Sequence, residues 1–456
     1  MRKKNQKQMS LVALNIEHPR AAELESISQI LDQNPIINEM VFQDLSRGVN
    51  NRDTGAEGMS AEQVIRSAII KQWEGFSYQE LAFHIVDSRS YRNFCRIGIT
   101  HKGFKKSALC KNIKRISPET WESINRILVA YGLDKNIEKG RESRMDCTVV
   151  SSNIHEPSDS SLLWDSVRVL TRMLNQAKEQ FEDLPLQFTD HSRRAKRRML
   201  GVLNAKNKRA RKKQYVDLLK VAHKTLTYCR TAASLLDKYA CTDPIKMLMA
   251  QGLSKEVKKV IDLTCRVMDQ TERRVLHGES VPASEKIVSI FEPHTDIIVK
   301  DRRDTFYGHK VCLNTGQSKL ITDCLIVDGN PKDSTLTDTM LDRHASIYGH
   351  YPLKVALDGG FASKDNLKSA KGKGLKDVCF SKRRGIEVED MCRSEHVYKR
   401  LRRFRAGIES AISWIKRCFG FAKCTWKSLR SFKSYVWASI VSANLLTLAR
   451  SGVLAT

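Results

Sequence analysis

Residues 396–433 read HVYKRLRRFRAGIESAISWIKRCFGFAKCTWKSLRSFK and contain eleven Lys and Arg but a single acid, Glu409. With about 100° per residue, a helix would place this acid within roughly 60° of three of the cations, Arg402, Arg405 and Lys416. A neighbouring apolar stripe is formed by Leu401, Phe404, Ile408, Ile412, Ile415 and Phe419. The pattern predicts a helix that packs by its apolar side and presents one carboxylate among cations.

A carboxylate surrounded by cations suits a metal-dependent phosphoryl-transfer site on nucleic acid. The acid would bind a divalent ion, and the cations would bind the phosphates of the polyanion. The alternative is an ordinary surface glutamate on an amphipathic basic helix. Residues elsewhere in the chain are needed to decide between these two interpretations.

The charge balance of the whole chain points to a polyanionic partner. Its 456 residues include 78 Lys and Arg against 51 Asp and Glu, a formal net charge of +27. Nucleic acid is favoured over a membrane, because no stretch approaches the ~20 apolar residues that span a bilayer. The N-terminus lacks the apolar core of a signal peptide, so a cytoplasmic, nucleoid-associated protein is expected. The twelve cysteines form no CxxC pair, which argues against a zinc finger or a disulfide framework.

Two capping boxes mark the N-terminal region. Ser60 with Gln63 precedes one apolar helical pattern, Gly75 interrupts it, and Ser77 with Glu80 precedes a second pattern. Two short helices about a glycine turn match the outline of a helix-turn-helix, and cations and aromatic residues follow them. An ordinary helical hairpin fits this outline equally well.

Other parts of the N-terminal region are helical or polar. Residues 20–31 read as a helix, and residues 46–57 read as a polar linker. Ser117 and Pro118 start a further helix that ends near Gly132.

A first strand is predicted at 147–150, a short β-branched run that Asp146 precedes. Asp159 and Ser160 resemble the N-cap of the next helix, and the chain then reads as helical to about residue 280. Within this helical region, 191–214 holds eleven Lys and Arg and no acid. We interpret it as a phosphate-binding surface, with a solvated face or flexible arm as the alternative. The cations expected to bind DNA there are Arg193, Arg194, Arg197, Arg198, Lys208, Arg209 and Arg211.

Strand signals return after residue 285. The β-rich segments are KIVSIF (286–291), DIIVK (296–300), YGHKVCLN (307–314), KLITDCLIV (319–327), LKVAL (353–357) and KDVCFSK (376–382). Gly316 centres a plausible hairpin turn, and helices are expected from Asp333 and from Ser363. This order of elements predicts a mixed sheet with helices packed on it.

Two acids lie where such a sheet would present them. Asp146 comes at the first strand, and Asp358 comes just past the carboxyl end of the strand at 353–357. Ligands of open α/β sheets gather near such ends. Alternatively, Asp358 opens a plain Asp-Gly-Gly turn and Asp146 is an ion-pair partner of Arg144.

These segments resemble a bacterial insertion-sequence transposase of the Asp-Asp-Glu class with an RNase H-like catalytic core. Arg405, Glu409 and Lys416 have the spacing of that family, which is Arg, three residues, Glu, six residues, Lys. One departure is Arg402, where the family often has Tyr three positions before its Arg, so an accessory contact is in question. The other matching stretches are 145–163, YGHKVCLN at 307–314, LIVDGNPKDSTL at 325–336 and ALDGGF at 356–361.

The resemblance implies an α/β fold, α+β overall, with an RNase H-like mixed sheet, packed helices, a long helical insertion after the first strand and an all-helical N-terminal domain. It implies a DNA-binding domain at 1–140, a catalytic domain at 141–160 and 285–456, and a basic helical insertion at 161–284.

The resemblance also implies a mechanism. Asp146, Asp358 and Glu409 would be catalytic and would hold two Mg²⁺ or Mn²⁺ ions about 3.5–4 Å apart. Cleavage at the element's end would free a 3′-hydroxyl, which would then attack target DNA. Arg405, Lys416 and Arg402 would contact double-stranded DNA, both terminal inverted repeats and target, and a homo-oligomer would assemble on it. The competing hypotheses are a metal-dependent nuclease without joining activity and a non-catalytic DNA-binding protein.

Overall fold

The computed structural model describes residues 3–4, 18–48, 58–300 and 304–453. Most of the predicted polar linker at 46–57 lies outside these residues. The chain forms two compact units, the first from Met1–Ser152 with His309–Thr456 and the second from Asn153–Gly308. Among the described residues, no helix combines the length and apolarity needed to cross a lipid bilayer.

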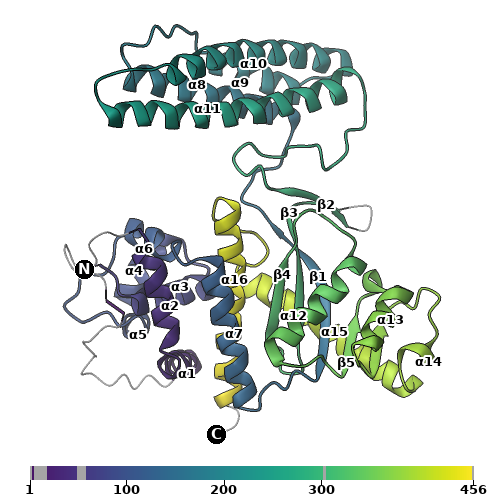
Figure 1. Ribbon diagram of the computed structural model, residues 1–456. Coiled ribbons are helices and arrows are strands. Elements are labelled where there is room, and N and C mark those ends of the chain that lie inside the picture. The colour runs from purple at the N-terminus through teal and green to yellow at the C-terminus, as the bar shows by residue number, and fades with distance from the viewer. Residues whose placement is uncertain (1–2, 5–17, 49–57, 301–303, 454–456) are drawn as a thin grey trace. The chain divides into compact units, whose positions relative to one another are not determined.

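The first unit begins with helices whose starts follow from local hydrogen bonds (Figure 1). Both predicted capping boxes form, at Ser60 with Gln63 and at Ser77 with Glu80, and Gly75 adopts φ 69°, a left-handed conformation that suits glycine. The predicted helix–turn–helix outline is therefore confirmed as a local structure. The helices are α1 (Pro19–Gln33), α2 (Ile36–Ser46), α3 (Ala61–Glu74), α4 (Tyr78–Asp87), α5 (Arg89–Phe94), α6 (Lys106–Ile113) and α7 (Pro118–Asp134).

A C-terminal helix that we did not predict joins these helices to the sheet. Helix α16 (Leu429–Val453) contacts α1, α3, α7 and strand β4 (Ile321–Ile326), and it lies beside α7 in Figure 1. Its side chains are buried almost all round, and Val436, Ile440 and Leu445 are inaccessible to solvent. The N-terminal helices therefore share one unit with the sheet, whereas the predicted boundaries made 1–140 a separate domain. Likewise, the second unit runs to Gly308, beyond the predicted end of the insertion at 284.

The sheet has six strands in the order β2-β3-β1-β5-β6, and β4 pairs with β3. Strands β1 and β5, and β5 and β6, are parallel, while β3 and β4 form the predicted antiparallel hairpin. Strand β1 starts earlier than predicted, at Glu142, so that Asp146 lies inside it. Strand β1 includes polar residues because side chains of the neighbouring strand hydrogen-bond to them. Ser143, for example, donates a hydrogen bond of 2.6 Å to the side-chain oxygen of Asn314. The bounds of the five strands other than β4 are β1 (Glu142–Ser151), β2 (Asp296–Lys300), β3 (Asp304–Thr315), β5 (Lys354–Leu357) and β6 (Asp377–Phe380).

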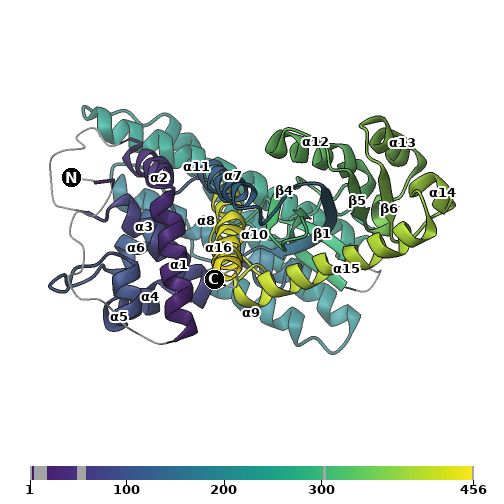
Figure 2. The same ribbon diagram turned by 90° about the horizontal axis from the view of Figure 1, so that it is seen from below.

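Helices cover both faces of this sheet. Helices α12 (Thr337–Tyr348) and α13 (Lys364–Gly372) lie on one side, and α15 (Glu395–Cys418) lies on the other (Figure 2). Helix α15 contacts β1, β5 and β6. Its apolar stripe, including the buried Leu401, Ile408 and Ile415, packs as the sequence pattern predicts. The short α14 (Val388–Met391) lies between β6 and α15 in the chain.

The second unit is a helical bundle, as predicted. Its helices are α8 (Asp159–Gln180), α9 (Ser192–Leu203), α10 (Lys208–Asp237) and α11 (Pro244–Thr271). The N-cap of α8 is Ser158, one residue before the predicted cap. The predicted strand at 286–291 is wrong. The backbone of Ile287 pairs with the amide side chain of Gln270, over 2.8 and 3.1 Å, instead of with a neighbouring strand.

Candidate active site

Three acids from distant parts of the chain surround the guanidinium of Arg405. Its Nη2 lies 3.1 Å from Oδ2 of Asp146 and 3.2 Å from Oδ1 of Asp358. Its Nη1 donates a hydrogen bond of 2.7 Å to Oε1 of Glu409. Since Asp146 and Asp358 approach the same nitrogen, their carboxylates face one another across a single atom. The structure thus brings together all three acids that the sequence singled out.

The sheet positions the two aspartates. In the parallel pair of β1 and β5, Met145 lies opposite Leu357. Asp146 follows Met145 within β1, and Asp358 follows directly after the end of β5. Asp146 also accepts a hydrogen bond of 2.8 Å from the backbone N–H of Cys147. Equivalent positions on adjacent parallel strands place both side chains at one edge, as expected for ligand sites of α/β sheets.

Asp358 is held ionised by its surroundings. Burial raises the pKa of this carboxyl. Hydrogen bonds from Ser381 and from the backbone N–H of Gly359, together with the charge of Arg405, lower the pKa by more than burial raises it. The net result is a pKa below the ordinary value. Ser381 donates to Oδ1 of Asp358 over 2.8 Å, and our sequence reasoning missed it. Its place just after β6, the strand beside β5, was the available signal.

Arg144 fixes helix α15 against β1. Its Nη1 donates to the carbonyl of Phe404 over 2.8 Å, its Nε donates to Thr315 over 2.8 Å, and its guanidinium lies 4.6 Å from the centre of the Phe404 ring. The alternative pairing of Arg144 with Asp146 is therefore not what orders this region. Gly407 permits the close approach, because a Cβ there would meet Nη1 of Arg144 at 1.9 Å. The helix is thereby held where Arg405 and Glu409 reach the strand ends.

The acids differ in their access to solvent. The side chains of Asp146 and Arg405 are 16% exposed, while those of Asp358 and Glu409 are 37% and 59% exposed. The site is consequently open on the side of Glu409 and closed toward the sheet.

Carboxylate oxygens are the ligands that Mg²⁺ and Mn²⁺ prefer. In the described part of the chain, however, no three His, Cys, Asp or Glu side chains are arranged to hold a metal ion by themselves. The reason is visible at the three acids, since Arg405 lies between them and supplies the positive charge. The donor set fits a divalent ion, whereas the present arrangement of these donors is bridged by the guanidinium.

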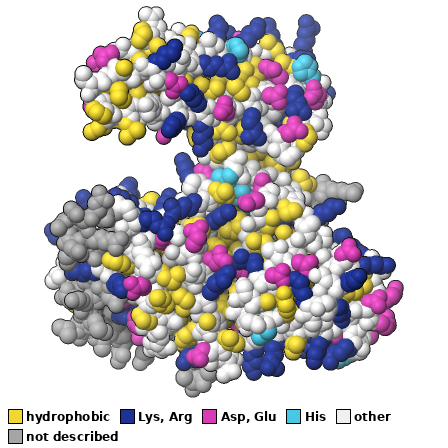
Figure 3. Space-filling view, in the orientation of Figure 1, with side chains coloured by type: hydrophobic (Ala, Val, Ile, Leu, Met, Phe, Trp, Pro, Cys, Tyr) yellow, Lys and Arg dark blue, Asp and Glu magenta, His cyan; other side chains and the backbone are white. Residues whose placement is uncertain are grey.

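The other cations predicted to bind DNA differ in their exposure and in their ion-pair partners. Arg402 is exposed on α15, and Lys416 is half-buried two turns beyond Glu409. In the second unit, Arg194 and Arg198 both bind Asp217. On the face shown in Figure 3, Lys and Arg are interspersed with acids and do not gather into one patch. Of the second-unit cations predicted to bind DNA, Arg193, Arg197, Lys208, Arg209 and Arg211 are also exposed.

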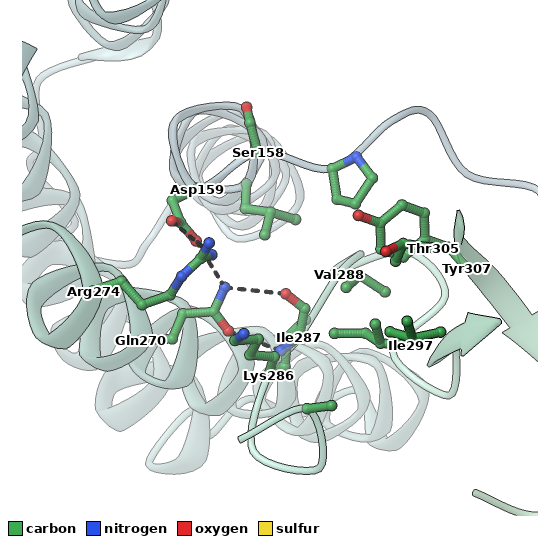
Figure 4. A pocket seen from close by; sticks show the side chains of 14 residues that line it. Ser158, Asp159, Gln270, Arg274, Lys286, Ile287, Val288, Ile297, Thr305 and Tyr307 are labelled. Carbon is green, nitrogen blue, oxygen red and sulfur yellow. Dashed lines mark hydrogen bonds and ion pairs between the residues drawn. The ribbon is translucent and has the colours of Figure 1, made fainter. Parts of the chain in front are cut away.

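The second unit contains a cavity of about 340 Å³ beside the start of α8 (Figure 4). Two of its charged groups neutralise one another, because Arg274 binds both oxygens of the buried Asp159 over 3.0 and 2.9 Å. Gln270 bonds Asp159 and the backbone of Ile287. Asp159 is structural, as predicted, although its role is to anchor α8 to α11 and not to cap the helix.

Comparison with protein families gives two matches. Residues 12–115 match the transposase domain DUF772, and residues 266–445 match the transposase DDE domain. The chain belongs to the insertion-sequence transposases of the DDE class. This transposase acts on DNA by phosphoryl transfer, its sheet and packed helices have the α/β, RNase H-like fold of the class, and the class generally uses divalent metal ions. Comparisons with curated proteins and with solved structures found no match.

The matched DDE region of the transposase contains Asp358, Arg405 and Glu409 but not Asp146. The second unit accounts for this gap, since it follows β1 directly and separates Asp146 from the rest of the sheet in the sequence. The catalytic assignment of Asp146 therefore depends on its position beside Asp358 and Arg405.

Proposed function

We propose that this transposase cleaves the ends of its insertion sequence and joins the freed 3′-hydroxyl to target DNA, with Asp146, Asp358 and Glu409 as its metal-binding acids. The supporting observation is the convergence of these three carboxylates on Arg405. Three carboxylates and one guanidinium leave a formal charge of −2 at the site, which attracts divalent cations. When bound, Mg²⁺ or Mn²⁺ would supply Lewis-acid stabilisation of the charge that develops on the transferring phosphate.

We propose that Arg405 has two successive partners. In the structure it pairs with all three acids and offsets part of their charge. If the acids held a metal ion, the planar donors of Arg405 would be available to a phosphate of the DNA, for which guanidinium geometry is well suited. Lys416 holds a flanking phosphate from the same helix. The cations of α15 would therefore position the phosphodiester against the three acids.

Two phosphoryl transfers follow in the same site. In the first, water attacks the phosphorus at the element's end, and the bond from phosphorus to the 3′-oxygen breaks. In the second, the freed 3′-hydroxyl loses its proton and attacks a phosphorus of the target strand, displacing the target's own 3′-oxygen. The first step consumes one water and converts a phosphodiester into a 3′-hydroxyl and a 5′-phosphate. The second step is a transesterification that conserves the number of phosphodiester and hydroxyl groups, so no further co-reactant is needed for joining.

A strand-transfer assay tests this proposal. The donor is a duplex that carries the DNA flanking the transposase gene, already cut to a 3′-hydroxyl, and joining to a target duplex is followed in Mg²⁺. We expect Asp146→Asn, Asp358→Asn and Glu409→Gln each to lower joining by at least about 10²–10³-fold, the loss typical for a group that stabilises transition-state charge. Glu395→Gln is the matched control, since Glu395 is exposed on the same helix, where it forms an ion pair with Lys399.

The assay also separates the competing functions. Cleavage of an uncut donor without joining of a pre-cut one would indicate a nuclease. DNA binding without any metal-dependent cleavage would indicate a non-catalytic protein. Joining that survives Glu409→Gln at the wild-type rate would remove Glu409 from the proposed set of acids.

A further inference from the structure

A second cavity, lined by lysines and aromatic residues, lies in the first unit. It measures about 670 Å³ and lies between the turn that joins α3 to α4, the end of α6 and the segment that follows α15. The residues that matter for its chemistry are Lys71, Tyr78, Lys114, Trp426 and Tyr435. The cavity therefore occupies the glycine turn of the helix-turn-helix outline, a feature that the catalytic site does not use.

Two of the three lysines that line this cavity, Lys71 and Lys114, lie against aromatic rings. Lys71 Nζ is 5.0 Å from the centre of the Tyr78 ring, and Lys114 Nζ is 6.0 Å from that ring and 5.8 Å from the Trp426 ring. Lys71 is only 6% exposed. Among the described residues, no acid forms an ion pair with either lysine. A buried ammonium without a counter-ion is costly, so the cavity favours an anion.

The titration of Lys71 agrees with this charge arrangement. Burial, followed by the like charge of Lys114, lowers the pKa of Lys71 to about 8. The one carboxylate that lines the cavity, Glu80, is exposed and accepts the backbone N–H of Ser77 over 2.7 Å as part of the capping box. Glu80 is thus committed to α4, and in the described part of the chain it forms no ion pair with Lys71 or Lys114.

A hydrogen-bond donor in the wall is also unsatisfied. Trp426 is 2% exposed, and its indole Nε1 is buried without a hydrogen-bond partner among the described residues. Aromatic faces, cations and an indole N–H are the groups that stack on a nucleobase and bind its phosphate. The volume lies within the roughly 300–1,000 Å³ of small-ligand sites. These features together select a ligand that is both aromatic and anionic.

We propose that this cavity binds one nucleotide, with its base against Tyr78 and Trp426 and its phosphate between Lys71 and Lys114. We take the nucleotide to be an unpaired nucleotide of the bound DNA, and only this choice of source rests on the proposed function. Strand β1 links the two sites: the backbone of Ser151, at its end, bonds Ala422 and Cys424 in the cavity-forming segment over 3.1 and 2.8 Å.

The spacing along β1 is compatible with one DNA strand serving both sites. Asp146 and Ser151 are five residues apart in an extended strand, which corresponds to about 17 Å. A nucleotide held in the cavity would therefore lie a few positions along the DNA from the reacting phosphodiester. We infer that the cavity fixes the position of the DNA relative to the three acids.

Tryptophan fluorescence of the full chain tests the proposal. The Asp358→Asn protein is titrated with deoxyadenosine 5′-monophosphate, with inorganic phosphate, and with a duplex whose end carries one unpaired nucleotide or one abasic residue. We expect saturable quenching by the nucleotide that is lost in Trp426→Phe. We also expect the nucleotide affinity to fall about tenfold in Lys114→Gln, since a lost charge-assisted hydrogen bond contributes about 1.4 kcal/mol or more. Lys111→Gln is the control, because Lys111 is exposed on the same helix, α6.

The outcomes separate the sources and the hypotheses. Tighter binding of the unpaired than of the abasic duplex supports DNA as the source, while equal binding of the two with retained binding of the mononucleotide supports a free nucleotide. Absence of saturable nucleotide binding, inorganic phosphate binding as tightly as the nucleotide, or equal effects of Lys111→Gln and Lys114→Gln would each overturn the proposal. Because binding is measured in Asp358→Asn, failure of the strand-transfer assay and failure of this titration are independent results.

Discussion

Two segments of this transposase carry the same number of cations but make different use of them. Residues 191–214 and 396–433 each contain eleven Lys and Arg. In the first segment, most cations lie exposed on α9 and at the start of α10, and Asp217 is the acid that Arg194 and Arg198 bind. In the second segment, Arg405 is mostly buried and binds three acids from β1, from the end of β5 and from α15 itself.

The difference arises from what each helix packs against. Helix α9 packs its apolar side within the helical bundle of the second unit, and most of its cations are on the exposed side. Helix α15 packs on three strands whose ends carry acids. A charge run alone therefore does not distinguish a DNA-contacting surface from part of an active site, and the neighbouring elements decide which of the two forms.

Among the experiments that test this comparison of the two basic segments, the largest effect is expected for the exposed cations of the second unit. Replacing four of them by Gln removes as many phosphate contacts and lowers the slope of log affinity against log salt by up to roughly 0.9 for each contact. We expect DNA affinity to fall on the order of 10–100-fold at moderate salt, with strand transfer restored at saturating DNA. Binding is measured by fluorescence anisotropy across a salt series with Arg193→Gln, Arg197→Gln, Arg209→Gln and Arg211→Gln combined.

The control for this change neutralises four exposed cations elsewhere in the second unit: Arg172, Lys178, Lys255 and Lys259. An equal loss of affinity and of salt slope in the control would mean that only the total charge matters. In that case the segment at 191–214 would have no special role.

Arg405→Gln tests the second segment. We expect Mn²⁺ to bind about tenfold more tightly, because hydrogen bonds between charged groups contribute about 1.5–3 kcal/mol and the glutamine no longer competes for the three acids. Joining activity should fall at the same time, since the phosphate contact is lost. Mn²⁺ affinity is measured by electron paramagnetic resonance, with Arg402→Gln as the control on an exposed position of the same helix. Unchanged Mn²⁺ affinity would mean that the guanidinium does not compete with metal.

Alanine substitutions at two glycines compare how closely helix α15 and helix α11 pack against their neighbours. Gly407→Ala should destabilise the first unit by about 1–3 kcal/mol, because the new Cβ displaces Arg144 from a buried position. Gly252→Ala, in α11 of the second unit, should stabilise by about 0.5–1 kcal/mol, since nothing lies within 4 Å of a Cβ there. Urea denaturation measures both changes. Stabilisation by Gly407→Ala would show that α15 is not held closely against β1.

The smallest expected effect is the pH dependence linked to Arg400. Burial raises the pKa of Glu142, but hydrogen bonds from Lys354, Arg400 and Gln317 lower it to about 2. The folded pKa is below the ordinary value, so the stability that Glu142 contributes is complete above about pH 4.5 and is lost as the pH falls toward 2. Arg400→Gln should therefore reduce the difference in unfolding free energy between about pH 5 and pH 3.

The control for this experiment is Arg403→Gln, an exposed position on α15. Urea denaturation at the two pH values should give the wild-type difference in this variant. If Arg400→Gln retained the full difference, Lys354 and Gln317 would be sufficient to hold Glu142 ionised.

Features that depend on neighbouring residues in the chain were predictable. Both capping boxes, the glycine turn between α3 and α4, the β3–β4 hairpin and the amphipathic helix α15 all form as the sequence indicates. Features that depend on distant partners were not. The run at 286–291 has β-branched residues but pairs with Gln270, and strand β1 includes polar residues because Asn314 and Thr315 bind them.

By itself, the sequence determined the three candidate acids, the spacing of Arg405 and Glu409 on one face of a helix, and the excess of positive charge that implies DNA as a partner. The tertiary structure alone decided that Arg405 bridges all three acids and that Arg144 and Gly407 hold α15 against β1. It also decided that Lys71 and Lys114 line one cavity, where no acid among the described residues forms an ion pair with them. The physical reason is that periodicity along one helix or strand orients its own side chains, whereas the charges and donors that meet them come from elements hundreds of residues away.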